Sequence, residues 1–222
     1  MNRLLLSMLL LACLLAGAAT HAGPWPRERG STFLSFTQGY EEDAGSSYGS
    51  AYAEYGLSDV YTAVLRWGHD GRRGRAATAS IRRPVGRPDK TNRFAVELGL
   101  GARKPPRHRP DAVLLRAGLH WGRGFESRFG SGWSTAALSV TRASRSPKEI
   151  RKLDLTLGLN IPNGRHLIAE LWIHQQEDET SATLAPSYVH ELRDGVKVQI
   201  GASYGLDRSG SAGIFTSGWV EF

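Results

Sequence analysis

Strict alternation of apolar and polar side chains over segments of about ten residues is the feature that most constrains this chain. In the clearest segment, Arg151 to Ile161, every second residue is leucine or isoleucine and the residues between them are polar or small. Successive side chains of a β-strand point to opposite faces, so this period of two predicts a sheet with one apolar and one polar face. Helical spacing, with apolar residues three and four apart, fits none of the segments well.

Twelve such segments follow one another between residues 31 and 222. They are Ser31 to Gly39, Tyr48 to Gly56, Tyr61 to Trp67, Arg75 to Val85, Arg93 to Ala102, Ala112 to Gly122, Gly132 to Arg142, Arg151 to Ile161, His166 to His174, Ser181 to Leu192, Val196 to Tyr204 and Ile214 to Phe222. The mean hydropathy of −0.32 excludes a bundle of membrane helices but allows a barrel, in which only alternate residues need be apolar. We predict an all-β fold: a single antiparallel up-and-down transmembrane β-barrel of about 12 strands.

Residues 1–22 have the features of an export signal peptide. Arg3 gives a positive start, Leu4 to Ala19 is almost wholly apolar, and Thr20 to Ala22 supplies the small residues that a signal peptidase reads. Cleavage after Ala22 leaves residues 23–30 as a short N-terminal periplasmic segment before a barrel of residues 31–222. Cleavage also removes Cys13, the single cysteine, so the mature chain has no disulfide, thiol nucleophile or thiolate metal site.

The connections between the segments alternate in kind. Those after the even-numbered segments are mostly tight, as at Pro162 to Arg165 and Arg193 to Gly195, whereas those after the odd-numbered segments are more charged. Outer-membrane barrels have short periplasmic turns and longer external loops, and an even number of strands puts both termini on the periplasmic side. One connection departs from this pattern, because Arg123 to Ser131 is predicted to be a long turn on the periplasmic side.

A soluble periplasmic barrel or sandwich that binds a ligand would show the same alternation with its faces reversed. The polar rows of this chain are rich in glycine, serine, threonine and single charges, which suits a crowded lumen better than a solvated exterior. The chain ends inside its last segment, on Phe222, with Val220 and Ile214 at alternate positions before it. This ending resembles the C-terminal signature of bacterial outer-membrane β-barrel proteins. The resemblance implies location in the bacterial outer membrane and recognition of Phe222 and Val220 by the barrel assembly machinery.

The stretch Tyr52 to Asp59 carries a second resemblance. Its order of tyrosine, alanine, glutamate, tyrosine, glycine, leucine, serine and aspartate resembles a hairpin that recurs in a proteobacterial family of outer-membrane barrels. This likeness implies the fold and the location, and it carries no catalytic positions.

The sequence gives no catalytic or metal site. Membrane-embedded hydrolases of barrel architecture, which act on lipid A or phospholipids, pair a histidine with a serine on the lipid-facing surface. Here His190 and Ser187 face opposite sides of one segment. His166, Glu170 and His174 share a face, but successive members lie roughly 13 Å apart in a strand, too far for one ion. We predict no cofactor and no metal, and keep a lipid-modifying enzyme as an alternative.

The net charge of +7 is concentrated in the longer connections. These connections are predicted to face outward, where lipopolysaccharide presents phosphates. Candidate contacts are Arg72, Arg73, Arg103, Lys104, Arg107 and Arg109. Plain solvation explains these residues equally well. Export and the barrel pattern exclude nucleic acid, the other usual partner of a basic protein, so we expect outer-membrane lipids and lipopolysaccharide as partners.

Charged residues on the polar rows are predicted to form a network inside the barrel. They are Glu54, Arg66, Arg82, Glu97, Arg116, Asp154, Glu170 and Lys197. An unpaired charge in a narrow lumen is costly, so most should pair across strands, and Arg116 is expected to reach Glu97, opposite roughly residue 117. Twelve strands lie between the filled eight-stranded barrels and the water-filled sixteen-stranded porins. The sequence therefore predicts a narrow diffusion channel or a non-conducting structural barrel, and leaves the two open.

Overall fold

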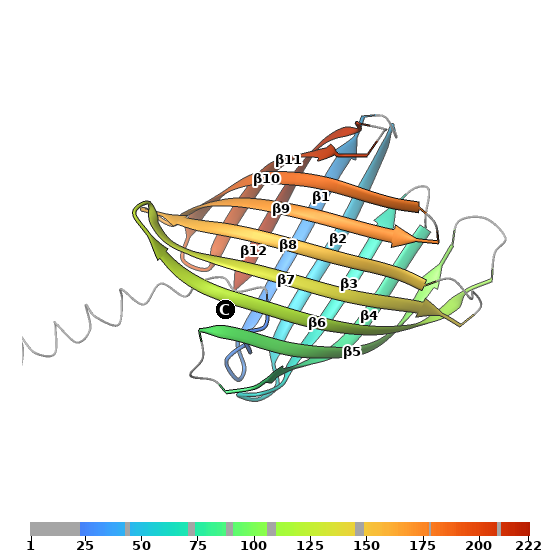
Figure 1. Ribbon diagram of the computed structural model, residues 1–222, viewed down its shortest axis with the longest axis horizontal. Coiled ribbons are helices and arrows are strands. Elements are labelled where there is room, and N and C mark those ends of the chain that lie inside the picture. Colours follow the sequence, from blue (N-terminus) through green and yellow to red (C-terminus); the bar gives the residue numbers. More distant parts are fainter. Residues whose placement is uncertain are drawn as a thin grey trace, which may run out of the picture.

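The computed structural model describes residues 23–222 except for 43–44, 71–73, 88–90, 106–109, 145–148, 178 and 208–209. These residues form one closed antiparallel barrel whose strands run obliquely around it (Figure 1). The strands are β1 (Thr32–Glu41), β2 (Ser46–Gly56), β3 (Thr62–Asp70), β4 (Gly74–Val85), β5 (Asn92–Lys104), β6 (Ala112–Ser127), β7 (Gly130–Ala143), β8 (Glu149–Ile161), β9 (Arg165–Gln176), β10 (Glu179–Arg193), β11 (Val196–Gly205) and β12 (Ala212–Glu221). The predicted all-β barrel of twelve strands is confirmed.

The described residues contain no helix that is long and apolar enough to cross a membrane. The predicted export signal, residues 1–22, lies outside the described residues.

Each strand pairs with its neighbours in sequence, and β1 also pairs with β12 to close the barrel. This seam runs from Phe33, opposite Glu221, to Glu41, opposite Gly213. Beyond the last pair, the N–H of Phe222 donates to the carbonyl of Thr32 at 3.0 Å, and the N–H of Thr32 donates back at 2.6 Å. The seam is therefore hydrogen-bonded as far as the terminal residue of the chain.

The two ends of the barrel differ in what they carry. We call the end that holds Gly23, Phe222 and the connections after the even-numbered strands the turn end. The opposite end holds the connections after the odd-numbered strands, and we call it the loop end.

The outward rows of most strands are apolar and exposed. Leucine and isoleucine make up much of this outer band: Leu65, Leu98, Leu100, Leu115, Leu119, Leu157, Leu167, Ile200 and Ile214. Exposed aromatic residues lie toward its two ends: Tyr55, Tyr61, Phe94 and Phe222 toward the turn end, and Tyr40, Trp67 and Tyr204 toward the loop end. An apolar band flanked by aromatic girdles is the surface of a transmembrane barrel. The alternative of a soluble periplasmic barrel or sandwich, with its apolar face inside, is therefore wrong.

Large aromatic side chains of the inward rows lie over glycines of the neighbouring strand. Trp133 pairs with Gly158 and Phe215 with Gly201. A Cβ atom on either glycine would overlap the facing ring. Glycine in a strand marks such close approaches, so several glycines of the polar rows serve to seat aromatic rings against the barrel wall.

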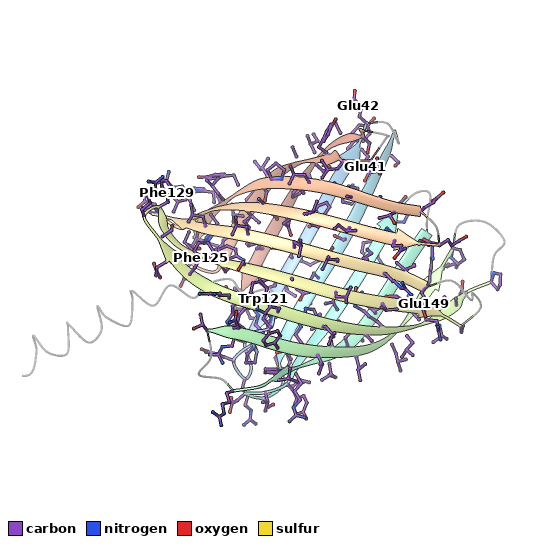
Figure 2. All side chains as sticks on the ribbon, in the orientation of Figure 1. Glu41, Glu42, Trp121, Phe125, Phe129 and Glu149 are labelled. Carbon is purple, nitrogen blue, oxygen red and sulfur yellow. The ribbon has the colours of Figure 1, made fainter. Side chains whose placement is uncertain are left out.

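The β6–β7 hairpin differs from the sequence prediction. The long turn expected over Arg123 to Ser131 is wrong, because β6 continues to Ser127 and β7 begins at Gly130. Phe125 lies against Gly132 on the facing strand, where a Cβ atom would overlap its ring. Arg123 interrupts the apolar row of β6, and Gly130 and Gly132 interrupt that of β7, which removes the alternation by which a strand is recognised. Figure 2 shows Phe125 and Phe129 near the tip of this hairpin.

Residues 23–30 lie at the turn end, and their first half is packed inside the barrel. Pro24 is less than 2% exposed and Arg27 is 8% exposed. The segment then joins the wall, since the N–H of Gly30 donates to the carbonyl of Gly56 at 2.8 Å and the N–H of Gly56 donates to that of Ser31 at 3.0 Å. The sequence placed this stretch in the periplasm beside the barrel; in the structure it fills part of the lumen.

Candidate functional site

Three arginines and one histidine converge on the buried carboxylate of Glu97 in β5. Arg66 donates to its two oxygens from Nη1 and Nη2, at 2.6 and 3.0 Å. Arg82 and Arg116 each donate from Nε at 3.3 Å. His120 Nε2 lies 3.3 Å from Glu97 Oε2. Glu97 is 1% exposed, and these partners compensate for the removal of its charge from water.

A second buried carboxylate, Glu54 of β2, extends this cluster toward the turn end. Arg82 Nη1 donates to Glu54 Oε1 at 2.6 Å, and Arg27 Nε donates to Oε2 at 2.8 Å. The hydroxyl of Tyr52 also donates to Glu54, and itself accepts from Arg82 Nη2 at 2.8 Å. Arg82 therefore bridges Glu54 and Glu97 into one network of ion pairs.

Arg27 anchors the N-terminal segment to this network. Its backbone N–H donates to Thr62 Oγ1 at 3.0 Å, and its guanidinium also donates to Glu221 in β12. The same guanidinium lies 4.9 Å from the centre of the Phe33 ring. Arg82 holds the start of the segment, because its Nη1 donates to the carbonyl of Gly23 at 2.7 Å. Contacts from β1, β2, β3, β4 and β12 thus fix the segment.

Two glycines of the wall make room for the segment. A Cβ atom on Gly122 would lie 2.6 Å from Trp25 Cη2 and 2.8 Å from Pro24 Cδ. A Cβ atom on Gly56 would overlap the carbonyl of Glu28. The segment therefore has a seat shaped to it at the turn end.

Apolar side chains fill the opposite side of the turn end. Trp133, Ile168 and Val189 form a buried cluster on the inner wall. Trp25 of the N-terminal segment and Trp219 of β12 pack against this cluster. The segment thus bridges the ion-pair network on one wall and the apolar cluster on the other.

Exposure changes along a single strand from the turn end to the loop end. Thr62 is 1% exposed and Val64 0%, although both face the lumen. Farther along the same inward row of β3, the side chain of Arg66 is 24% exposed. Solvent would reach all three residues in a water-filled pore. The inward row of β3 is therefore covered at the turn end, where the N-terminal segment lies.

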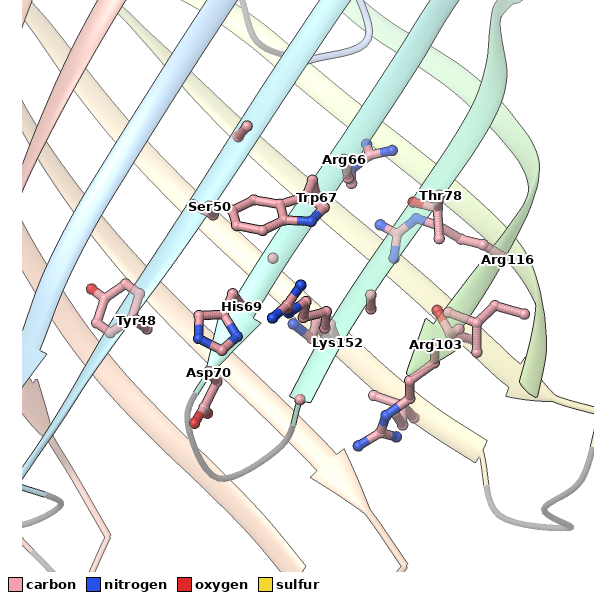
Figure 3. A pocket seen from close by; sticks show the side chains of 18 of the residues that line it. Tyr48, Ser50, Arg66, Trp67, His69, Asp70, Thr78, Arg103, Arg116 and Lys152 are labelled. Atoms are coloured by element: carbon pink, nitrogen blue, oxygen red, sulfur yellow. The ribbon is translucent and has the colours of Figure 1, made fainter. Parts of the chain in front are cut away.

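Two adjoining hollows lie in the lumen. A cavity of about 520 Å³ toward the loop end, which we call the vestibule, is lined in part by Arg66, Arg103, Arg116 and Lys152 (Figure 3). A cavity of about 300 Å³, which we call the chamber, is lined mainly by aromatic side chains and includes Glu170. The two share lining residues Tyr48, Ser50 and Tyr52, so they adjoin.

The predicted lumen charges divide into two groups. The structure brings together Glu54, Arg66, Arg82, Glu97 and Arg116. Asp154, Glu170 and Lys197 also lie on inward rows, but none of the three forms an ion pair within the part of the chain that the structure describes. Glu97 lies opposite Gly118, one position from the predicted residue 117, and Arg116 still reaches it.

The basic loop residues are only partly described. Arg72, Arg73, Arg107 and Arg109 lie outside the described residues. Of the other two candidates, Arg103 lines the vestibule and Lys104 is exposed at the end of β5. At the opposite end, Val220 lies on the outward row of β12 and Phe222 is 70% exposed.

The residues considered for catalysis and metal binding lie apart. His190 is exposed on the outer face and its ring stacks on Tyr188, with centroids 6.4 Å apart, whereas Ser187 is buried on the inner face. Within the described ranges, no three His, Cys, Asp or Glu side chains are grouped so that they could hold a metal ion.

Sequence reasoning missed Arg27, Trp25, Tyr52 and His120 as parts of this site. Arg27 and Trp25 precede the first strand, where no periodic pattern assigns them a face. Tyr52 carried a signal, because it begins the Tyr52 to Asp59 stretch noted for its resemblance. That stretch also supplies Glu54, which binds Arg27, and Gly56, which lies against the segment.

Comparison with known proteins relates this fold to solved barrels. No protein family model matches the chain, and no curated protein matches it. Among solved structures, the NanC porin gives a TM-score of 0.55 at 10% identity, covering 84% of this chain and 98% of that one. The translocator domain of the autotransporter NalP from Neisseria meningitidis gives 0.48 at 13% identity, covering 88% and 89%. A loop L8 deletion mutant of OmpT, an outer membrane protein of Vibrio cholerae, gives 0.43 at 7% identity, covering 86% and 98%.

The fold is that of an outer-membrane β-barrel. The likeness to the NanC porin extends over nearly the whole of that chain and establishes the architecture. The apolar outer band and its aromatic girdles agree with this fold. What this outer-membrane barrel does depends on its lumen.

Proposed function

We propose that the protein is an integral barrel of the bacterial outer membrane whose lumen is closed on the periplasmic side by its own N-terminal segment. The turn end faces the periplasm in this proposal, because both termini and the tight turns lie there. The lipid-facing band and the likeness in fold to solved outer-membrane barrels support this location. Outer-membrane lipids and the barrel assembly machinery are then its expected partners.

The observation that carries the proposal is the burial of Arg27 between Glu54 and Glu221. A guanidinium that binds carboxylates of two strands, while Trp25 packs against the apolar cluster, leaves the segment little freedom to move. Of the two functions that the sequence left open, the non-conducting barrel fits this geometry better than the diffusion channel. The hollow part of the lumen then faces the cell exterior as a blind cavity.

A lipid-modifying enzyme is the weaker candidate. Such an enzyme needs a nucleophile and a base within hydrogen-bond reach, and His190 and Ser187 lie on opposite faces of β10. No other observation on the outer face favours lipid hydrolysis.

Planar-bilayer recordings of the purified, folded protein test the proposal. We expect no discrete conductance steps from the native protein. Arg27→Ala removes both ion pairs of the segment and should produce small steps, because the segment can then leave its seat. Lys104→Ala, which removes an exposed cation at the loop end, should stay silent. Regular steps from the native protein would refute the closed barrel.

A further inference from the structure

The chamber has the size and lining of a small-molecule site. It measures about 300 Å³ and adjoins the vestibule. Seven of its lining residues are aromatic: Phe33, Tyr48, Tyr52, Trp133, Trp172, Phe215 and Trp219. Ligand sites in proteins are typically concave, largely apolar and supplied with a few polar groups that orient the ligand.

Glu170 is the only acidic residue in the lining of the chamber. The other two glutamates of the inner lumen, Glu54 and Glu97, each bind at least two arginines. Glu170 is hydrogen-bonded to the side chain of Trp172 and forms no ion pair with a described residue. A carboxylate in a partly enclosed site without a cationic partner favours a ligand that supplies one.

The aromatic rings of the chamber form two groups in contact. Trp172 lies next but one to Glu170 on β9, with its ring centre 6.0 Å from that of Phe215. On the adjoining wall Phe33 makes edge contacts with Tyr52 and Trp219, at 6.2 and 5.9 Å. Ring faces attract cations that keep an apolar surface, and such cages are the recognised way in which proteins bind quaternary ammonium groups.

We propose that the chamber binds a small organic cation with an apolar body, an amine or quaternary ammonium compound, which enters from the loop end. Glu170 supplies the counter-charge and the rings enclose the alkyl or aryl groups. Of the five arginine and lysine residues that line the vestibule, Arg66 and Arg116 are already paired with Glu97. The inference goes beyond the closed barrel and holds whether or not the barrel conducts.

Tryptophan fluorescence gives a direct test, since Trp133, Trp172 and Trp219 line the chamber. The folded protein in detergent is titrated at pH 8 with benzyltrimethylammonium, benzyl alcohol and benzoate, which share a ring and differ in charge. We expect saturable quenching by the cation, binding at least about tenfold weaker for the alcohol, and none for benzoate. Equal binding of cation and alcohol would overturn the proposal, and so would tighter binding of benzoate.

Variants locate the site. Glu170→Gln keeps the shape of the side chain and removes its charge. It should therefore weaken binding of benzyltrimethylammonium about tenfold and leave binding of benzyl alcohol unchanged. Trp172→Leu, a second variant, does not alter the charge of the chamber. It should weaken binding of both benzyltrimethylammonium and benzyl alcohol. Glu179→Gln, an exposed loop-end carboxylate outside the chamber, is the matched control. Cation binding that survives both Glu170→Gln and Trp172→Leu in folded protein would place the ligand elsewhere and refute the assignment.

Discussion

The two halves of the lumen are built from the same strands and differ in what fills them. Toward the turn end, inward side chains such as Val64 and Val189 are 0% exposed. Toward the loop end, the same inward rows line two hollows of about 520 and 300 Å³. The outer face shows no such contrast, because its apolar band continues along both halves.

This contrast separates two roles of the alternating pattern. The outward row determines that the barrel sits in lipid, and it does so uniformly. The inward row determines whether the lumen is filled, and a few large side chains with one short segment are enough to fill half of it. A separate plug domain is unnecessary in a barrel of this size.

The largest expected effect comes from removing the centre of the ion-pair network. Glu97→Ala leaves Arg66, Arg82 and Arg116 without their shared counter-ion inside the barrel. Breaking a buried ion pair on one side costs about 3 to 5 kcal/mol, so the urea midpoint of the folded protein in micelles should fall sharply.

Glu149→Gln is the control for this change. Glu149 also binds two arginines, Arg142 and Arg151, but at the exposed end of β8. Exposed pairs contribute little, so its unfolding midpoint should match that of the parent. If Glu97→Ala and Glu149→Gln lowered the unfolding midpoint equally, the network around Glu97 would be solvated. The difference in burial between the two halves of the lumen would then be contradicted.

A smaller effect is expected from crowding the seat of the N-terminal segment. Gly122→Val places methyl groups where Trp25 and Pro24 lie, and overpacking of this kind costs about 1 to 3 kcal/mol. The segment should be displaced, with conductance steps in bilayers and a lower unfolding midpoint. Gly124→Val is the matched control, because a Cβ atom there meets only one carbonyl, at 3.9 Å. If the two variants had the same conductance and the same unfolding midpoint, the proposed packing of Trp25 and Pro24 against Gly122 would be wrong.

The smallest effect is expected for Arg116→Ala. Glu97 keeps Arg66, Arg82 and His120 when this side chain is removed, so the loss is that of one charge-assisted hydrogen bond, about 1 kcal/mol. Thermal unfolding of both variants, measured in one series, should show a smaller fall in the melting temperature for Arg116→Ala than for Glu97→Ala. A loss for Arg116→Ala as large as that for Glu97→Ala would mean that the remaining partners do not compensate.

The barrel itself was predictable because its signal is local. An alternation such as that of Leu153 to Ile161 gives the strand and both of its faces without knowledge of its neighbours. The prediction failed at Arg123 to Ser131, where Arg123 in β6 and Gly130 in β7 replace the apolar residues that define a row.

The packing of residues 23–30 inside the barrel was not predictable, because it depends on groups far apart in the chain. Arg27 and Glu221 meet only when β12 closes on β1, and no pattern in residues 23–30 indicates that they turn inward. The four partners of Glu97 come from β3, β4 and β6, so their convergence follows from the register of the whole barrel. Pairing of Arg116 with Glu97 could be anticipated only because a single hairpin joins them.

Cysteine labelling tests the closed turn end most directly. Cys13 is the only cysteine of the chain and belongs to the predicted signal, so single cysteines can be placed in the mature protein. Val189 and Thr183 both lie on the inward row of β10. Val189→Cys places a thiol in the buried turn end, and Thr183→Cys places one toward the loop end. In micelles, where a polar maleimide reaches both ends, Thr183→Cys should label rapidly and Val189→Cys only after unfolding. Equal labelling of the two in the folded protein would contradict a lumen closed at the turn end.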